Sequence, residues 1–269
     1  MVPIAHADDG AGSTRLPAGW NGLVGLKTTR GRQPMSNSGS RLTSELVVSR
    51  TVRDTAAVLE VTHGHTSGDL YHLAPPDRSY REEVRAEVPS GLRVDLLVDG
   101  GDEYEIDPEC VAAAENGARL VESWGQTVEP VTGDVLFGGD GRVNMLGRPL
   151  TEDEVDPYNW AAAERGAALT VADLFKAQDA QQMWSAEACE WMDQYDLLIT
   201  PTAGCPPMLI EDCEPDPAFS VPLHWTDDGL PTGTQFVAGM GHEDFLLQVA
   251  ARCETEQPWS DRRPVVWAG

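Results

Sequence analysis

A run of small residues that ends in a serine, near the start of the chain, restricts the local backbone more than any other segment. Residues 9–18 read Asp9-Gly10-Ala11-Gly12-Ser13-Thr14-Arg15-Leu16-Pro17-Ala18. Gly10 and Gly12 can adopt backbone angles that are closed to larger side chains. The run therefore predicts a tight turn whose N–H groups converge on one point as an anion-binding nest. A hydroxyl in such a nest is a nucleophile beside its own oxyanion hole. The alternative is a small-residue turn that only enters a strand, because short motifs often match by chance.

The charge of the chain limits its partners. It carries 44 acidic and 19 basic residues, a formal net charge of −25, and only two of the basic residues are lysines. Such a surface repels the phosphates of nucleic acids, so we expect no nucleic-acid partner. The acidic residues are spread along the chain rather than gathered in one tail. This pattern fits a halophilic protein of a high-salt cytoplasm, where self-repulsion is screened. An acidic enzyme of an ordinary cytoplasm is the alternative.

The cysteines and histidines do not form a pattern that is typical of metal sites. Five cysteines without a Cys-x-x-Cys pair predict reduced thiols in a cytoplasmic protein rather than a disulfide framework. Cys205 and Cys213 are spaced wrongly for a zinc knuckle. The three histidines between residues 63 and 72, with Asp69 as a fourth ligand, are a second candidate, but loop histidines in an acidic protein are more often solvated. We therefore expect no metal and no cofactor. No apolar run reaches membrane length and no secretory leader opens the chain, so we also expect no membrane partner.

Four segments spread over most of the chain carry a resemblance to one enzyme family. They are residues 5–32, with Gly-Leu-Val-Gly-Leu-Lys at 22–27 and Gly-Arg at 31–32, residues 49–56, residues 196–202, and residues 220–222 with 228–235. In this order they resemble the signature segment, the SRTVRDxA helix start, the DxLLTPT strand and the SVP…GLPxGxQ hairpin of the amidase signature family of serine hydrolases. The first segment is most similar to the branch that contains bacterial amidases and 6-aminohexanoate cyclic dimer hydrolases.

The resemblance implies an amidase-type serine hydrolase that cleaves the carbon–nitrogen bond of a small-molecule amide. The serine of the family's DxGGS element is the acyl-enzyme nucleophile, and it falls on Ser13. Asp9 and Arg15 then support the turn through charge-assisted hydrogen bonds. We expect Ser13 at a buried turn on a sheet edge, with several N–H groups aimed near its Oγ. The implied oxyanion donors are the backbone N–H groups of Gly10, Ala11, Gly12 and Ser13.

The family's other catalytic groups have no counterpart in the sequence. In the family, a bridging serine passes the proton of the nucleophile to a neutral lysine, and a neutral lysine requires burial and a lowered pKa. Both groups lie upstream of the nucleophile, whereas no lysine or serine precedes Ser13 here. Lys27 lies where the family has a structural lysine, and Lys176 lies in a helix-like segment.

These gaps predict an N-terminally truncated amidase that is inactive by itself. The shortened connection at residues 203–219 agrees with a partial amidase. A separately encoded N-terminal amidase fragment could complete it, and a homo-oligomer is the other expected assembly. The alternative is a noncatalytic scaffold or subunit protein that retains the amidase fold.

Strands that alternate with helices predict an α/β fold, a layered mixed β-sheet flanked by helices, in a single amidase-like domain over residues 1–269. Asp107 and Pro108 open one helix as its N-cap and its first-turn proline. The acidic, glycine-rich stretch at 133–156 is the expected disordered or lid-like segment, and 62–80 is an expected loop. The expected strands are 20–32, 42–50, 92–98, 128–131 and 197–200, and the expected helices are 52–61, 107–124, 161–195 and 243–256.

Overall fold

The computed structural model describes residues 2–34, 43–100, 105–131, 166, 168–207 and 221–263. It divides into two compact units, Met1–Gly133 with Met192–Gly269, and Asp134–Trp191. The described part of the second unit is mainly helix α6 (Val171–Met192), whose side chains are all at least partly exposed. The single amidase-like domain stays a prediction. None of the helices in the described ranges is both long and apolar enough to cross a bilayer.

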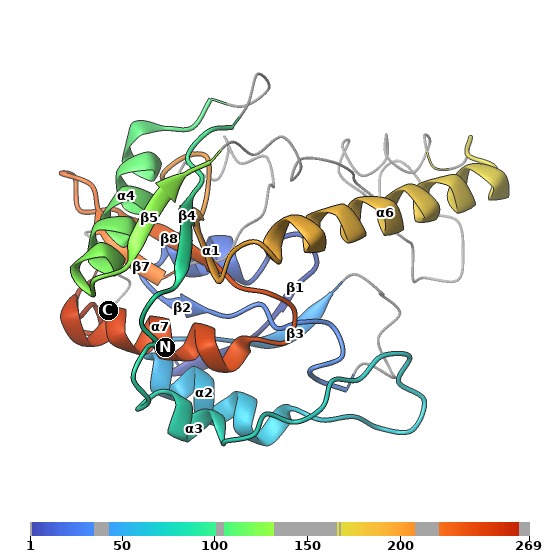
Figure 1. Ribbon diagram of the computed structural model, residues 1–269, viewed down its shortest axis with the longest axis horizontal. Helices are drawn as coiled ribbons and strands as arrows, with labels where there is room; N and C mark the ends of the chain where they lie inside the picture. The colour runs from blue at the N-terminus through green and yellow to red at the C-terminus, as the bar shows by residue number, and fades with distance from the viewer. Residues whose placement is uncertain are drawn as a thin grey trace. The chain divides into compact units, whose positions relative to one another are not determined.

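A small antiparallel sheet positions the serine turn. It contains β1 (Ile4–Asp9), β3 (Ser44–Ser49) and β2 (Val24–Gly25), in the order β1-β3-β2 (Figure 1). β1 pairs with β3 along its whole length, from Ile4 opposite Ser49 to Asp9 opposite Ser44. β1 is an edge strand, so its outer row of backbone groups has no neighbouring strand among the described residues. The turn that contains Ser13 therefore begins at a sheet edge, as predicted.

A larger mixed sheet forms the centre of the first unit. Its strands β5 (Thr127–Pro130), β4 (Arg93–Leu96), β6 (Leu197–Pro201), β8 (Pro231–Val237) and β7 (Val221–Trp225) follow one another in that order. The pairs β5–β4 and β4–β6 are parallel, and the pairs β6–β8 and β8–β7 are antiparallel. This arrangement confirms the predicted mixed sheet.

Helices cover the two faces of the large sheet. α4 (Pro108–Ser123) packs against β8 so closely that a Cβ at Gly117 would collide with the Thr234 side chain. α1 (Arg15–Trp20) also packs against β8, where its first residue contacts Gln235. Because neighbouring residues of a strand point to opposite faces, Thr234 and Gln235 place α4 and α1 on opposite sides of the sheet. The fold is therefore the layered α/β fold that the sequence predicts.

Three of the helices begin at side-chain caps that the sequence makes recognisable. α2 (Val52–Thr62) is capped by Thr51, whose side chain accepts a hydrogen bond from Asp54 N–H. Asp107 caps α4 in the same way, with Pro108 at the first turn as expected. α3 (Tyr80–Glu83) is a single turn with a capping box, and α7 (Glu243–Glu256) has the bounds that the sequence predicts.

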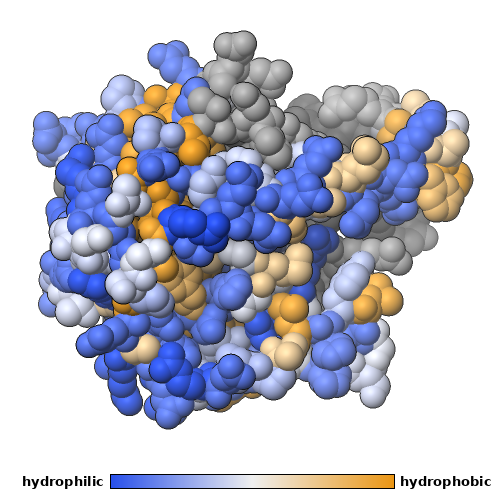
Figure 2. Space-filling model, viewed as in Figure 1, coloured by the Kyte–Doolittle hydropathy of each residue, from blue (hydrophilic) through white to orange (hydrophobic). Residues whose placement is uncertain are grey.

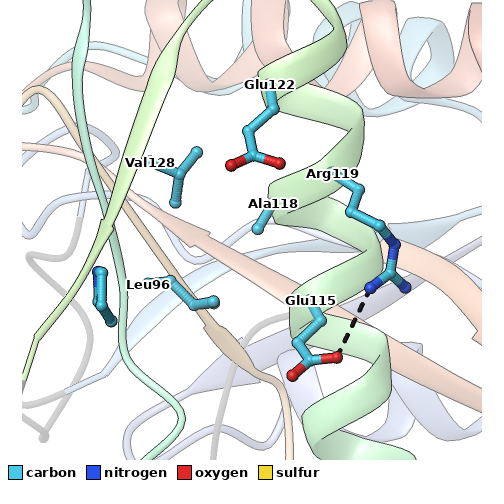
Figure 3. A pocket seen from close by; sticks show the side chains of 7 residues that line it. Leu96, Glu115, Ala118, Arg119, Glu122 and Val128 are labelled. Atoms are coloured by element: carbon cyan, nitrogen blue, oxygen red, sulfur yellow. Dashed lines mark ion pairs between the residues drawn. The ribbon is translucent and has the colours of Figure 1, made fainter.

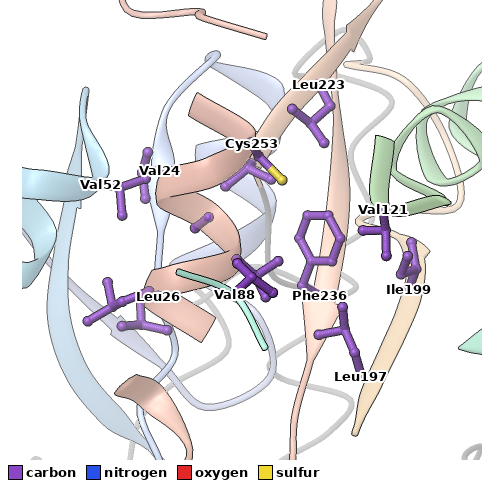
Figure 4. Close-up of a cluster of buried hydrophobic side chains, with 14 of the residues drawn as sticks. Val24, Leu26, Val52, Val88, Val121, Leu197, Ile199, Leu223, Phe236 and Cys253 are labelled. Carbon is purple, nitrogen blue, oxygen red and sulfur yellow. The ribbon is translucent and has the colours of Figure 1, made fainter. Parts of the chain in front are cut away.

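One continuous apolar core joins the two sheets (Figure 4). Val24 and Leu26 contribute to it from the small-sheet side, and Ile199 and Phe236 contribute from the large sheet. Cys253 of α7 lies in the same cluster and is fully buried. Such a shared core fixes the edge of one sheet relative to the face of the other, because close-packed interiors transmit displacements.

The expected strand at 20–32 is wrong over most of its length. α1 extends to Trp20, a turn follows, and only Val24–Gly25 pairs as a strand. Side-chain bonds rather than a ladder hold the rest, including one from the Thr28 hydroxyl to Gln33 and one from Thr29 N–H to Glu243. The other expected strands agree with the structure within about two residues where it is described. The stretch 133–156 and the start of the helix expected at 161–195 lie outside the described residues.

Candidate active site

The segment from Asp9 to Arg15 folds as a tight turn between β1 and α1. Gly12 has a φ of 110°, a conformation that strongly favours glycine, whereas Gly10 lies outside the positive-φ region. The Gly12 N–H donates to Asp9 Oδ1 over 2.7 Å. The Gly12 carbonyl accepts from Leu16 N–H over 3.0 Å, so the turn leads directly into the helix. The predicted turn is confirmed, with one unusual glycine rather than two.

Arg15 holds the carboxylate of Asp9 with two nitrogens. Nε donates to Oδ2 over 2.8 Å, and Nη2 donates to Oδ1 over 3.1 Å. Asp9 is fully buried. Burial favours a raised pKa, but the hydrogen bond and charge of Arg15, with the Gly12 N–H, outweigh it and hold the pKa of Asp9 below its usual value. The carboxylate is therefore ionised at neutral pH and ties the two ends of the turn together.

The third nitrogen of Arg15 reaches the large sheet. Nη1 donates to Gln235 Oε1 over 3.2 Å, and the Gln235 side-chain amide donates to Thr200 Oγ1 over 3.0 Å. These two residues were missed by reasoning from the sequence. The only signal was the GLPxGxQ resemblance, which ends at Gln235 but does not say which residue it contacts.

Ser13 is exposed, which corrects the expectation that it is buried. Gly12 and Thr14 on either side of it are buried, and the inner side of the turn is filled by the Asp9 carboxylate. Ser13 itself lies at the surface of the turn. Within the part of the chain that the structure describes, Ser13 is therefore accessible to another molecule.

The four N–H groups expected to bind an oxyanion are not equivalent. That of Gly12 is already bonded to Asp9, so a bound oxyanion would compete with a carboxylate for it. Within the described ranges, the N–H groups of Gly10, Ala11 and Ser13 donate to no other group. They are thus the amides best able to donate to a new acceptor.

Lys27 shares the electrostatic environment of this turn. It follows β2, whose Gly25 packs against the start of α1; a Cβ there would lie 3.0 Å from the Thr14 carbonyl oxygen. Burial, and then the positive charge of Arg15, lower the pKa of Lys27, while Asp9 acts in the opposite direction. The sequence suggested a structural lysine, and its partly buried position next to a buried ion pair is compatible with that interpretation.

Of the three histidines considered as metal ligands, one packs against a tyrosine and two pack against each other. The His63 ring packs edge-on against Tyr80 with 5.4 Å between centroids, and the rings of His65 and His72 lie 4.9 Å apart. Asp69 accepts hydrogen bonds from Thr66 instead. Across the described parts of the chain, no three histidine, cysteine or acidic side chains gather as a metal site would require. Cys213 lies outside the described residues.

A shallow groove lies between α4 and the edge of the large sheet (Figure 3). Its volume is about 240 Å³. None of the predicted site residues lines it. The lining residues are Leu96, Val128 and Pro130 from the sheet and Glu115, Ala118, Arg119 and Glu122 from α4.

An exposed serine at a glycine turn, with backbone N–H groups beside it and a layered α/β sheet behind it, is the arrangement expected in serine hydrolases that use backbone oxyanion donors. The family model described as Amidase matches residues 1–136. The chain therefore belongs to the amidase family, and its motifs place it among the amidase signature enzymes.

Curated relatives support this assignment. The chain is 33% identical to the 6-aminohexanoate-cyclic-dimer hydrolase of Paenarthrobacter ureafaciens over 322 aligned positions, which cover 98% of this chain and 65% of the relative. It is 28% identical to the acylamidase of Rhodococcus erythropolis, with 98% of this chain and 63% of that one covered. The chain thus spans about two thirds of the length of these relatives.

Solved structures show the same fold. The 6-aminohexanoate cyclic dimer hydrolase complexed with its substrate superposes with a TM-score of 0.81 and 30% identity, covering 98% of this chain and 66% of that one. A bacterial aryl acylamidase of the amidase signature family superposes with a TM-score of 0.77 at 21% identity, covering 96% and 63%. The second likeness concerns the fold alone.

Proposed function

We propose that this chain carries the nucleophile of an amidase, with Ser13 as the residue that is acylated. The observation behind the proposal is the exposed Ser13 on a turn that is braced from inside by the buried Asp9–Arg15 pair. A brace of this kind holds a nucleophile in one position, which lowers the entropic part of the barrier. Asp9 and Arg15 are supporting residues, since their own polar atoms face each other.

The proposed reaction has two steps. Ser13 Oγ attacks the carbonyl carbon of an amide, its proton passes through a base to the leaving nitrogen, and an ester with Ser13 forms as the amine departs. Water then hydrolyses the ester, which releases the acid and restores the hydroxyl. The oxyanion of each tetrahedral intermediate accepts hydrogen bonds from the turn; among Gly10, Ala11, Gly12 and Ser13, the first candidates are the three amides other than that of Gly12, which is bonded to Asp9.

The base is proposed to come from another polypeptide segment. Lys176 lies on α6, and Lys27 lies among the positive charges of Arg15 and Arg30 near a buried ion pair. Neither stands in the position of the family's catalytic lysine. An N-terminal amidase fragment would bring the lysine and the bridging serine. The chain by itself is then expected to hydrolyse no amide measurably.

The proposed substrate is a small-molecule amide. One similar protein is named a cyclic-dimer hydrolase and another an acylamidase. A test panel therefore includes the 6-aminohexanoate cyclic dimer, a linear aliphatic amide and an aryl acylamide.

The proposal is tested with the purified chain, alone and co-expressed with the N-terminal third of a related cyclic-dimer hydrolase. The readouts are turnover of the panel and covalent labelling of serine by a fluorophosphonate, located by peptide mass mapping. We expect no turnover from the chain alone, and labelling of Ser13 in the complex. A complex that contains the lysine and bridging serine but leaves Ser13 unlabelled would show that the nucleophile is assigned wrongly. Turnover by the chain alone that Ser13→Ala abolishes would point to a base within this chain, and Lys27→Met would test the lysine that shares the electrostatic environment of the turn.

A noncatalytic scaffold or subunit is the second candidate function. It is favoured by the contacts of the described residues, because Lys176 pairs with Asp173 and no base among them is bonded to Ser13, and a nucleophile without a base gives little catalysis. This candidate predicts that a stable complex forms with an amidase partner and that Ser13→Ala changes neither its assembly nor its activity.

A further inference from the structure

The guanidinium of Arg15 joins the Ser13 turn to the centre of the large sheet. Two of its nitrogens hold Asp9, and the remaining one donates to Gln235, which is 220 residues away in the sequence. The side chain of Gln235 is half-buried and rests on Thr200. All three nitrogens of this guanidinium are therefore bonded, and only one of the bonds comes from outside the turn.

The two sheet residues hold each other in one arrangement. Thr200 and Gln235 lie directly opposite in the β6–β8 ladder, so their side chains share a face. The Thr200 hydroxyl donates to the Pro201 carbonyl over 2.9 Å and can only accept from Gln235. The side-chain NH₂ of Gln235 must then face Thr200, which leaves its Oε1 to accept from Arg15.

We propose that Gln235, oriented by Thr200, is a positioning residue for the nucleophile Ser13. It fixes the plane of the Arg15 guanidinium, which keeps both oxygens of Asp9 occupied and the Gly12 N–H aligned on one of them. Without this contact the guanidinium can rotate about its side-chain bonds, and the turn loses its only described hydrogen bond to the large sheet. The inference rests on the proposed function, because the role of Gln235 is defined by the reaction at Ser13. Gln235 touches no reacting atom and acts through Arg15.

Four variants test this role. Gln235→Leu removes the acceptor at nearly constant size, and Gln235→Glu retains an acceptor of the same length. Thr200→Val removes the partner that orients the glutamine. Gln257→Leu is the matched control, since it removes a side-chain bond of 3.0 Å to Asn116 at the far end of α7.

Two readouts separate this inference from the proposed function. The first is hydrogen–deuterium exchange of the amides of residues 10–16 in the full chain, which needs no catalysis. The second is the rate of fluorophosphonate labelling of Ser13 in the complemented complex. For Gln235→Leu and Thr200→Val we expect about tenfold faster exchange in this segment and about tenfold slower labelling, as for the loss of one hydrogen bond to a charged group. Gln235→Glu should stay within about threefold of the wild type, and Gln257→Leu should match it in this segment.

Each outcome decides one question. Unchanged exchange at residues 10–16 in both Gln235→Leu and Thr200→Val would overturn the positioning role. Faster exchange throughout the chain, with no rescue by Gln235→Glu, would also overturn it, because the effect would then be general destabilisation. If wild-type Ser13 is never labelled, the proposed function fails, and the exchange result still settles whether Gln235 orders the turn. If Gln235→Leu does not fold, Thr200→Val and Gln235→Glu supply the same comparison.

Discussion

Two arginine–carboxylate pairs in this chain have similar contacts and different surroundings. Arg32 donates to Glu243 over 2.9 Å, and its other nitrogens donate to the carbonyls of Ala74 and Gly241. The second oxygen of Glu243 accepts from the Thr29 N–H. The partners of this pair are backbone groups of loops and of the segment before α7. The pair therefore anchors the start of α7 to the loop after β2. The pair of Arg15 and Asp9 is just as well bonded, but it holds a turn with an exposed serine.

The difference shows how one interaction serves two purposes. A buried ion pair contributes little net stability over apolar packing, because desolvation offsets most of the attraction, yet it fixes geometry. At Arg32 the geometry that is fixed is the path of a loop. At Arg15 it is the position of a hydroxyl at the surface. Changes at the first pair should therefore alter folding alone, and changes at the second should alter reactivity as well.

The largest expected effect is on the chemistry at Ser13. Ser13→Ala should reduce serine labelling and any amide turnover of the complemented chain by at least about a thousandfold, because the attacking atom is removed. The melting temperature should not change, since Ser13 is exposed. Ser90→Ala, at another exposed serine, is the control and should label normally. Equal labelling of both variants would contradict the assignment.

The next largest effect is expected from breaking the enclosed pair. Arg32→Met leaves Glu243 buried without its cation and should lower the free energy of unfolding by about 3–5 kcal/mol in urea titrations. The double variant Arg32→Met/Glu243→Leu should recover part of this loss, because no unpaired charge remains. Where the variants are folded, labelling of Ser13 should be unaffected. A loss of labelling in proportion to stability would contradict the separation of the two pairs.

Removing the charge of Asp9 should make stability less dependent on pH. The pKa of Asp9 is lowered in the folded state, so its contribution is present above the unfolded value of about 3.9 and is lost as the pH falls through the folded pKa. The difference in unfolding free energy between the wild type and Asp9→Asn should be largest near neutral pH and should shrink on acidification. Urea titrations between pH 7 and 3 measure it. A difference that stays constant over this range would exclude the linkage.

The smallest effect concerns the surface rather than either pair. The face in Figure 2 is covered mostly by hydrophilic residues, and the chain has a net charge of −25. The Debye length shrinks from about 10 Å at 0.1 M salt to about 3 Å at 1 M, so KCl should raise the melting temperature. A matched sucrose series controls for exclusion effects. A melting temperature that is flat or falling in KCl would reject the high-salt interpretation.

Much of the fold could be predicted because its signals are local. Asp107 with Pro108, and the apolar spacing of residues 243–256, mark helices within a few neighbouring residues. β1 could not be predicted in this way, because Ile4–Asp9 lacks a clear alternation and becomes a strand only by pairing with β3. The strand prediction for 20–32 was wrong because the apolar residues of this region are divided among a helix end, a two-residue strand and a loop.

The same distinction holds for the candidate site: its local features could be predicted from the sequence, and its long-range contacts could not. Asp9, Gly12, Ser13 and Arg15 stand close together in the sequence, so their turn and their ion pair could be predicted. The exposure of Ser13 could not, since it depends on which side of the turn Asp9 fills. The contact with Gln235 was equally hidden, because it requires the packing of α1 against β8.

Because Arg15 and Gln235 lie far apart in the sequence, the ribosome also makes them at different times. A ribosome adds about 5–20 residues per second, so the 220 positions between them take roughly 10 to 40 s to translate. During that interval the nascent chain contains the residues of the serine turn and of its ion pair but not β8, which anchors the turn. A chain released before β8 would present the intact Asp9–Arg15 sequence without its external support. The strand that supports the Ser13 turn is thus made well after the turn itself.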